Sequence, residues 1–101
     1  MNYQGNKWKK LRKKILRMDG YKCQIDKQYG IVTEAQTVHH IYPVSLFPQY
    51  QWCVWNLISV SNSNHNRLEN RKTGELTKLG KQLMNSIDPG TDWRSNKYAT
   101  K

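Results

Sequence analysis

The chain has 101 residues, with 17 Lys and Arg against 7 Asp and Glu, and a formal net charge of +10. This length predicts one domain over residues 1–101, with a core at 7–86 and a basic, loosely ordered tail at 87–101. So large an excess of positive charge favours a polyanionic partner, most simply nucleic acid. An anionic membrane surface is the weaker alternative, because no stretch is apolar enough to anchor in a membrane.

Two features of the sequence indicate the compartment. Residues 1–5 contain no apolar run of the kind found in secretion signals. Cys23 and Cys53 lie far apart in the chain, and we expect them to be free thiols rather than a disulfide. We therefore expect a cytoplasmic protein.

Residues 7–18 are expected to form an amphipathic helix. Trp8, Leu11, Ile15 and Met18 recur at steps of three and four and form one apolar stripe. The other faces are basic and carry no acid, so salt bridges within the helix cannot neutralise them. A solvated face is the simpler interpretation, but the lack of acids favours contact with phosphates. These basic residues are Lys9, Lys10, Arg12, Lys13, Lys14 and Arg17.

The middle of the chain is expected to hold short strands. Residues 21–24 favour a first short strand. Residues 36–42 favour a second, because they are rich in β-branched and aromatic side chains. Pro43 and Pro48 then open a loop with several aromatic residues, and residues 57–60 favour a further strand.

Two helices are expected after the last strand. Residues 61–63 supply Ser and Asn as candidate N-caps for a helix over 64–72. A last helix follows Gly74, with three leucines on one face, and stops at the Asp-Pro-Gly of 88–90. In the tail beyond it, we expect Trp93 or Tyr98 to act as an anchor. The three leucines are Leu76, Leu79 and Leu83.

All three histidines of the chain lie in one short window that is free of Lys and Arg. His39 and His40 are adjacent on an expected strand, so their side chains point to opposite sides. One of them can therefore bind a metal while the other faces a substrate. His65 and Glu69 are four residues apart and share a face of the expected helix. With His39 they form a mixed ligand set for one divalent ion: Mg²⁺, Mn²⁺, Ni²⁺ or Zn²⁺.

This pattern indicates a one-metal phosphodiesterase site. A histidine with an ordinary pKa near 6.5 is free to take a proton from water at neutral pH. A divalent ion polarises the phosphate and neutralises the leaving oxygen. His40 is the candidate base, and His39 and His65 are the candidate ligands. Each residue alone is more often a surface, cap or turn residue, so the hypothesis depends on the combination.

Several blocks of the sequence, in order, resemble the HNH endonuclease family, and more narrowly its small stand-alone bacteriophage members. The resemblance covers roughly residues 8–80. It implies an α+β fold, the ββα-metal domain, with a two-stranded antiparallel hairpin and flanking N- and C-terminal helices. The blocks are WKKLR (8–12), ILRMDGYKCQ (15–24), VHHIYP (38–43), WNLIS (55–59), HNR (65–67) and NRKTGELT (70–77).

The resemblance also implies a role for each site residue. His39 matches the first-strand metal ligand, His40 the general base, and His65 the metal ligand on the helix. Asn56 matches the middle residue of the catalytic motif, which braces the loop between the strands. Glu69 stands where some relatives, including the nuclease colicins, have a third ligand that is histidine.

The chain departs from the family at a second metal site. Many relatives carry two CxxC pairs that bind a structural zinc ion. Here Cys23 is present, but its partner position is Asp26, and the other pair falls at Ser61 and Asn64. Three of the four thiolates are missing, so we predict no structural Cys₄ zinc site. Cys53 lies outside that frame and is expected to be a small, buried or half-buried residue.

Aromatic residues are expected to take over the role of the missing zinc in the core. The chain has four Trp and six Tyr, and each buries a large apolar area. We assign Trp8 and Trp55 to the core. For Trp52 and Tyr42, packing in the core and stacking on bases both remain open.

The leading hypothesis is a divalent-metal-dependent endonuclease that leaves 5′-phosphate and 3′-hydroxyl ends on DNA, as the resemblance implies. Arg67, Arg71 and Lys72 would join the basic helix in holding phosphates, contacts that bind rather than specify. The alternative is a non-catalytic DNA-binding or packaging accessory module associated with a phage terminase, and an RNA-binding protein is a third class. We expect a monomer or weak homodimer, in the bacterial host cytoplasm if the protein is phage-encoded.

Overall fold

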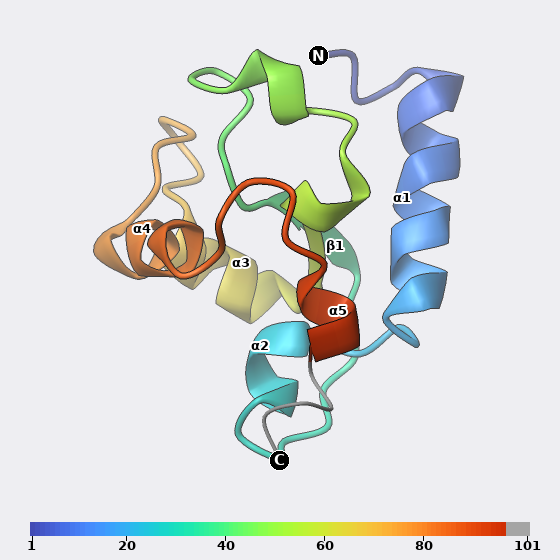
Figure 1. Ribbon diagram of the computed structural model, residues 1–101, viewed down its shortest axis with the longest axis vertical. Coiled ribbons are helices and arrows are strands. Elements are labelled where there is room, and N and C mark those ends of the chain that lie inside the picture. The colour runs from blue at the N-terminus through green and yellow to red at the C-terminus, as the bar shows by residue number, and fades with distance from the viewer. Residues whose placement is uncertain (97–101) are drawn as a thin grey trace.

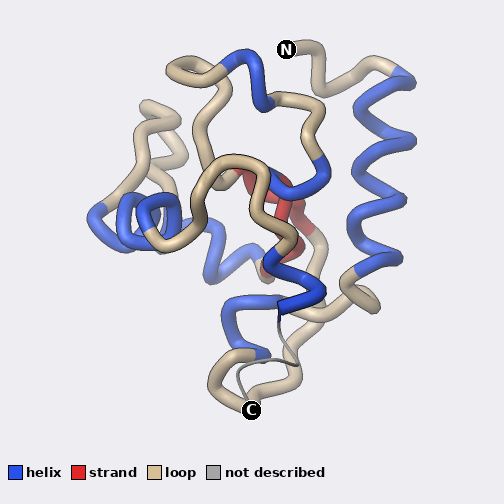
Figure 2. Tube along the Cα trace, viewed as in Figure 1, coloured by secondary structure: helices blue, strands red, loops and turns tan. Residues whose placement is uncertain are grey.

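A two-stranded antiparallel hairpin lies at the centre of the computed structural model, which describes residues 1–96 (Figure 1). Strand β1 spans Thr37–His40 and strand β2 spans Leu57–Val60, with His39 opposite Ile58. Helices and loops enclose the hairpin (Figure 2). Within the described residues, no helix is long and apolar enough to cross a membrane.

Successive side chains of the hairpin point to opposite faces and enter two different apolar clusters. Each face of the hairpin is therefore covered by apolar side chains. Leu57 packs with Trp8 and Ile15 on the side of helix α1, which spans Asn6–Met18. Ile58 packs on the other side with Leu68 and further apolar residues of the second cluster. The predicted bounds of β2 match the structure, and β1 is shorter than the expected strand over 36–42.

Helix α1 follows the expected stripe except at its end. Trp8 and Ile15 are buried, and Leu11 packs against their cluster. The prediction for Met18 was wrong, since it is 49% exposed, whereas Leu16 is buried. The chain leaves the helix at Gly20, whose φ of +63° lies in the left-handed region that glycine adopts without strain.

The expected strand at 21–24 was wrong. Lys22 alone forms a bridge, with Glu34, and helix α2 then spans Gln24–Lys27. The buried Gln24 amide donates to the carbonyl oxygens of Asp19 and Lys22. These side-chain hydrogen bonds hold the backbone in a helical turn rather than leaving it free to pair as a strand.

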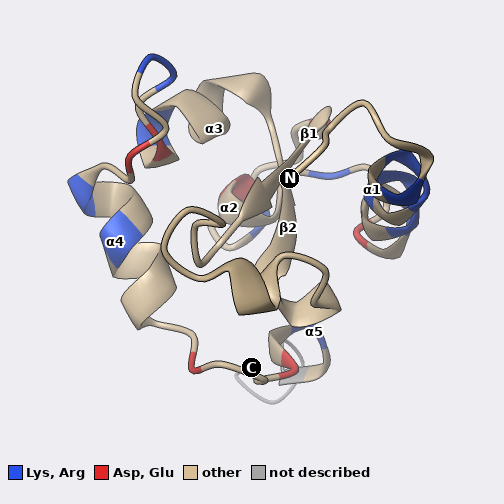
Figure 3. Ribbon diagram, turned by 90° about the horizontal axis from the view of Figure 1, so that it is seen from above, with Lys and Arg blue, Asp and Glu red and all other residues tan. Residues whose placement is uncertain are grey.

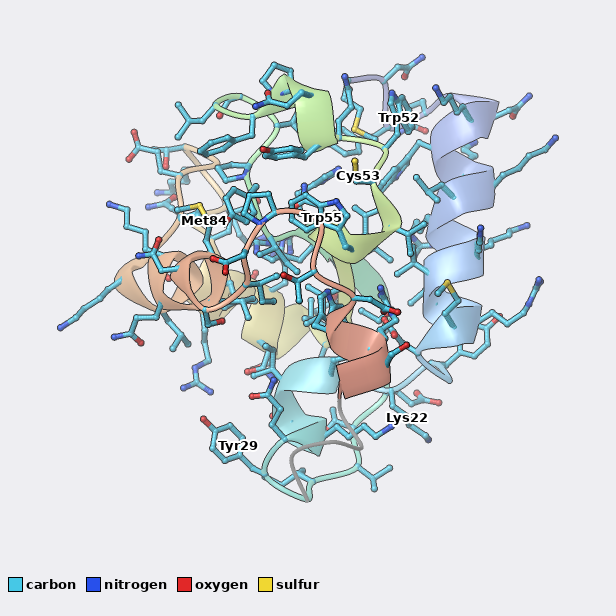
Figure 4. The ribbon with its side chains drawn as sticks, viewed as in Figure 1. Lys22, Tyr29, Trp52, Cys53, Trp55 and Met84 are labelled. Atoms are coloured by element: carbon cyan, nitrogen blue, oxygen red, sulfur yellow. The ribbon has the colours of Figure 1, made fainter. Side chains whose placement is uncertain are left out.

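The loop between the strands contains two short 3₁₀ helices, η1 (Pro48–Tyr50) and η2 (Val54–Asn56). Its aromatic side chains pack mainly edge to face around Tyr42, with ring centroids 5.1 Å (Phe47), 5.6 Å (Tyr50) and 5.5 Å (Trp55) away. Trp52 packs against the α1 cluster (Figure 4). Aromatic packing thus fills the space over this end of the hairpin.

Helix α3 spans Asn62–Leu68 and is shorter than the predicted helix over 64–72. Its N-cap is Ser61, the first of the three candidates over 61–63, so the helix begins two residues before the predicted start. The helix stops because Asn70 accepts hydrogen bonds from the backbone N–H groups of Lys72 and Thr73, which forms a turn. Glu69 is therefore extended and pairs with Leu76.

Helix α4 spans Lys78–Asn85 and crosses close to α3. Leu76 was expected on this helix, but it lies before the N-cap, Thr77. A Cβ atom at Gly80 would lie 2.1 Å from the carbonyl oxygen of Leu68. Only glycine allows so close an approach.

The C-terminal segment packs against the rest of the domain up to residue 96. Helix α5 spans Trp93–Asn96, and Trp93 donates to the carbonyl oxygen of Trp55 over 2.7 Å. Arg94 pairs with the buried carboxylate of Asp19 through Nε at 2.7 Å and Nη2 at 3.0 Å. Tyr98, the other expected anchor, lies outside the described residues.

Replacing Arg94 by Ala should lower the free energy of unfolding by about 3–5 kcal/mol, because Asp19 would keep a buried charge without its partner. Urea unfolding followed by Trp fluorescence measures this loss. Arg17→Ala is the matched control, since Arg17 is an exposed arginine of α1. Equal stability of the two variants would contradict a structural role for the Arg94–Asp19 pair.

Candidate metal and catalytic site

His39 is a buried histidine whose ring nitrogens have no hydrogen-bond partner among the described residues. Its Nδ1 lies 3.6 Å from Oε1 of Glu69. Burial, reinforced by the nearby His65, lowers the pKa of His39 to about 3. The ring is therefore neutral at pH 7, which is the form that binds metals. Leaving both nitrogens unpaired would cost free energy that a bound metal ion would recover in part.

His65 and Glu69 complete a cluster with His39. Nε2 of His65 on α3 lies 3.6 Å from Oε2 of Glu69, just beyond the end of that helix. One ligand atom from each of the three residues lies within 4.8 Å of the others. The facing His65 side chain lowers the pKa of Glu69, which keeps the carboxylate ionised. Two imidazoles, one of them with no hydrogen-bond partner in the described residues, and an ionised carboxylate fit one divalent metal ion.

His40 lies on the opposite side of β1 from His39 and is held by two contacts. The Trp8 ring stacks on the imidazole at 5.3 Å between centroids and 20° between planes. Nε2 of His40 lies 3.1 Å from the carbonyl oxygen of Gln51. Because a carbonyl can only accept, Nε2 carries the proton of the neutral ring and Nδ1 keeps its lone pair. Burial lowers the pKa of His40, so the ring is neutral at pH 7.

Asn56 is completely buried and holds the loop between the strands. Its amide donates to the carbonyl oxygens of Tyr42, at 3.0 Å, and Tyr50, at 3.2 Å. It also accepts from the Tyr42 N–H at 2.7 Å. Tyr50 precedes Gln51, so these bonds hold the segment whose carbonyl orients His40. The side chain is directed to the loop backbone rather than to the cleft.

An open cleft of about 320 Å³ brings His40, His65 and Glu69 together beside α1. The cleft includes residues that the sequence did not indicate, because their approach depends on how α1 and its N-terminal extension return to the hairpin. Of the lining residues beside α1, the sequence indicated Arg12 as a phosphate contact and Trp8 as a core residue, but neither as part of a cleft. The other lining residues are Tyr3, Trp8, Arg12, Gln36, Thr37 and Val38.

The predicted phosphate-contacting residues form two groups on either side of the hairpin (Figure 3). On α1, Arg12 differs from the rest, since it is half-buried in the cleft and donates to the carbonyl oxygen of Gln36. Arg67 lies on α3, and Arg71 and Lys72 lie in the turn after it rather than on the predicted helix. The exposed members are Lys9, Lys10, Lys13, Lys14, Arg17, Arg67, Arg71 and Lys72.

The four positions where many relatives carry zinc-binding cysteines come together through hydrogen bonds. The Asn64 amide donates to Sγ of Cys23 at 3.3 Å and to Oδ1 of Asp26 at 2.9 Å. Burial alone would raise the pKa of Cys23, but hydrogen bonds from Asp26, Ser61 and Asn64 outweigh it and lower the pKa. Polar contacts therefore hold the turn before α2 against the start of α3.

The comparisons with known proteins agree with this geometry. A short antiparallel hairpin is closed by a helix, and beside it lies a His/His/Glu cluster that could hold one metal ion. The chain is similar to the crystal structure of the HNH endonuclease of the deep-sea thermophilic bacteriophage GVE2 with manganese ion, at 31% identity and a TM-score of 0.63. The match covers 64% of this chain and 71% of that one. No family model matches the chain, and none of the curated proteins does.

The chain belongs to the HNH endonuclease family. The predicted α+β class, with its antiparallel hairpin and flanking helices, is confirmed. The cysteines Cys23 and Cys53 form neither a disulfide nor a cysteine zinc site within residues 1–96.

Acid should destabilise the metal-free protein through His39. The unfolded chain binds a proton on this residue below about pH 6.5, whereas the folded chain does so only near pH 3. Stability is therefore lost as the pH falls below 6.5, by at most ~1.4 kcal/mol per pH unit for this group. We expect the free energy of unfolding, measured with urea in chelator between pH 7 and 4.5, to fall less steeply with pH in His39→Gln than in the wild-type protein. Identical slopes for the two proteins would contradict the assignment.

The hydrogen bonds of Asn64 should contribute measurably to stability. Asn64→Ala removes the donor to the buried sulfur of Cys23, and we expect a loss of about 1–3 kcal/mol in the free energy of unfolding. Asn66→Ala, at an exposed position of the same helix, is the control and should change stability little. Thermal and urea unfolding of both variants would test this, and a loss no larger than the control's would contradict it.

Proposed function

We propose that the protein is a divalent-metal-dependent endonuclease that hydrolyses DNA phosphodiester bonds. One observation carries the proposal: His40, on one side of β1, lines the same cleft as His65 and Glu69 of the candidate metal cluster. A base and a metal-ligand set side by side are what phosphodiester hydrolysis requires. Membership of the HNH endonuclease family supports the same activity.

His39, His65 and Glu69 would hold the metal ion. When bound, a divalent ion polarises the phosphate and offsets charge on the leaving oxygen. Three protein ligands leave positions for water and substrate. Since the phage GVE2 structure contains manganese, Mn²⁺ is the first ion to test, beside Mg²⁺, Ni²⁺ and Zn²⁺.

His40 would act as the general base. Its lowered pKa keeps it neutral at pH 7, so Nδ1 is free to take a proton from the attacking water. The Gln51 carbonyl fixes the tautomer and the Trp8 ring fixes the plane of the imidazole. Asn56 supports this arrangement indirectly, through its hydrogen bond to Tyr50.

The two basic groups would hold the DNA backbone. The α1 group and the α3–α4 group lie on opposite sides of the hairpin, so a strand in the cleft would have positive charge on both sides (Figure 3). Most of these residues are exposed lysines and arginines, whose contacts with phosphate add affinity without sequence preference. We therefore expect salt-sensitive binding with weak sequence preference.

Incubation with supercoiled plasmid tests the activity directly. We expect nicked or linear plasmid with at least one of the four metal ions, and none in chelator. His40→Ala should lower the cleavage rate by about 10²–10⁴-fold, because a general base is lost. The rise in melting temperature on adding the metal should persist in His40→Ala and disappear in His39→Ala.

Three outcomes would contradict parts of this proposal. Plasmid binding without nicking under every metal would favour the non-catalytic accessory module. Cleavage by His40→Ala at the native rate would show that another group is the base. Tighter binding of RNA than of DNA would favour the RNA-binding alternative.

A further inference from the structure

Tyr3 lies in the extension before α1 and lines the same cleft as His40, His65 and Glu69. Its ring packs edge-on against Trp8, at 5.4 Å and 87°, and lies 6.3 Å from the His40 ring. Because Trp8 stacks on His40, the three rings form a continuous wall along the cleft. Tyr3 lies at the solvent-exposed end of this row of rings, since it is 50% exposed whereas Trp8 is 6% exposed.

The hydroxyl of Tyr3 makes no hydrogen bond with any residue in the described part of the chain. The hydroxyl of Tyr42, by contrast, donates to the carbonyl oxygen of Ile87 over 2.7 Å. This bond joins the loop between the strands to the segment after α4. Burial and then the carboxylate of Glu69 raise the pKa of Tyr3. The phenol shares the cleft with Glu69 of the candidate metal cluster and keeps its proton at neutral pH.

A free hydroxyl group that keeps its proton is a hydrogen-bond donor, and Tyr3 carries this donor on a residue that lines the cleft. The acceptor that enters such a cleft beside a metal cluster is a phosphate oxygen, and Arg12, on the same side, adds positive charge. The edge-to-face contact with Trp8 leaves a face of the Tyr3 ring open, but only the hydroxyl of Tyr3 can donate a hydrogen bond to the phosphate backbone. The variants below separate these two contacts, because Tyr3→Phe keeps the ring and removes the hydroxyl.

We propose that Tyr3 contacts the substrate directly, its hydroxyl donating a hydrogen bond to a non-bridging phosphate oxygen of the DNA strand in the cleft. This inference rests on the proposed nuclease function and adds a substrate-contacting residue to its site. The contact would hold the strand against the wall that contains the base, with the scissile phosphate between that wall and the metal ligands.

Tyr3→Phe removes only the hydroxyl and is the decisive variant. With a labelled duplex and Mn²⁺, we expect kcat/KM to fall about tenfold, the usual scale for one hydrogen bond to a charged group. The melting temperature should not change, because the hydroxyl has no partner in the protein. Tyr29→Phe is the matched control, since Tyr29 is 76% exposed and projects from the loop after α2 (Figure 4).

A binding measurement separates failure of this inference from failure of the proposed function. The affinity of the His40→Ala protein for the same duplex in Mn²⁺ is compared with that of His40→Ala/Tyr3→Phe. A drop in affinity supports the contact, even if the wild-type protein proves unable to cut, and so does a drop in cleavage that leaves the pH–rate profile unshifted. Values unchanged in both measurements overturn it.

Two further outcomes would also overturn the proposal. Full activity in Tyr3→Phe with a loss in Tyr3→Ala would show that the ring, not the hydroxyl, is required. A shift of the acidic limb of the pH–rate profile in Tyr3→Phe, with KM unchanged, would show that Tyr3 acts through His40 and does not touch the substrate.

Discussion

The buried carboxylate of Asp19 joins three parts of the chain that are far apart in sequence. It follows α1, accepts a hydrogen bond from the Ser59 N–H of β2 at 3.1 Å, and pairs with Arg94 of α5. A buried charge is tolerated only when its oxygens are paired and hydrogen-bonded, so these partners must lie where they do. The position of α1 along the hairpin follows from this constraint, and with it the placement of Trp8 against His40.

Strand β1 of the hairpin carries the candidate metal ligand His39 and the candidate base His40 on opposite sides. His39 points towards α3 and Glu69, where burial keeps it neutral and its ring nitrogens have no hydrogen-bond partner among residues 1–96. His40 points towards α1, where Trp8 and the Gln51 carbonyl fix its ring. The alternation of side chains along a strand is what divides the two adjacent histidines in this way.

Local sequence predicted the elements whose hydrogen bonds and apolar patterns are themselves local. Helix α1 and strand β2 were predicted within one residue of their bounds, and the N-cap of α3, Ser61, is one of the three predicted candidates. The end of α3 was missed, because the Asn70 turn competes with the helix. The approach of Gly80 to Leu68 and the docking of Arg94 involve partners distant in sequence, so no local pattern indicated them.

The sequence by itself determined the class of fold and the family, and it predicted that His39, His65 and Glu69 lie together. The strand period fixes the side to which His39 points. Glu69 approaches His65 from an extended residue beyond the end of α3, which the helix period did not predict. Tertiary structure alone decided what surrounds that cluster. Tyr3 reaches the cleft, and Gln51 orients His40, only because the segments that carry them fold back over the hairpin. Such contacts depend on packing between distant segments, which no spacing along the chain encodes.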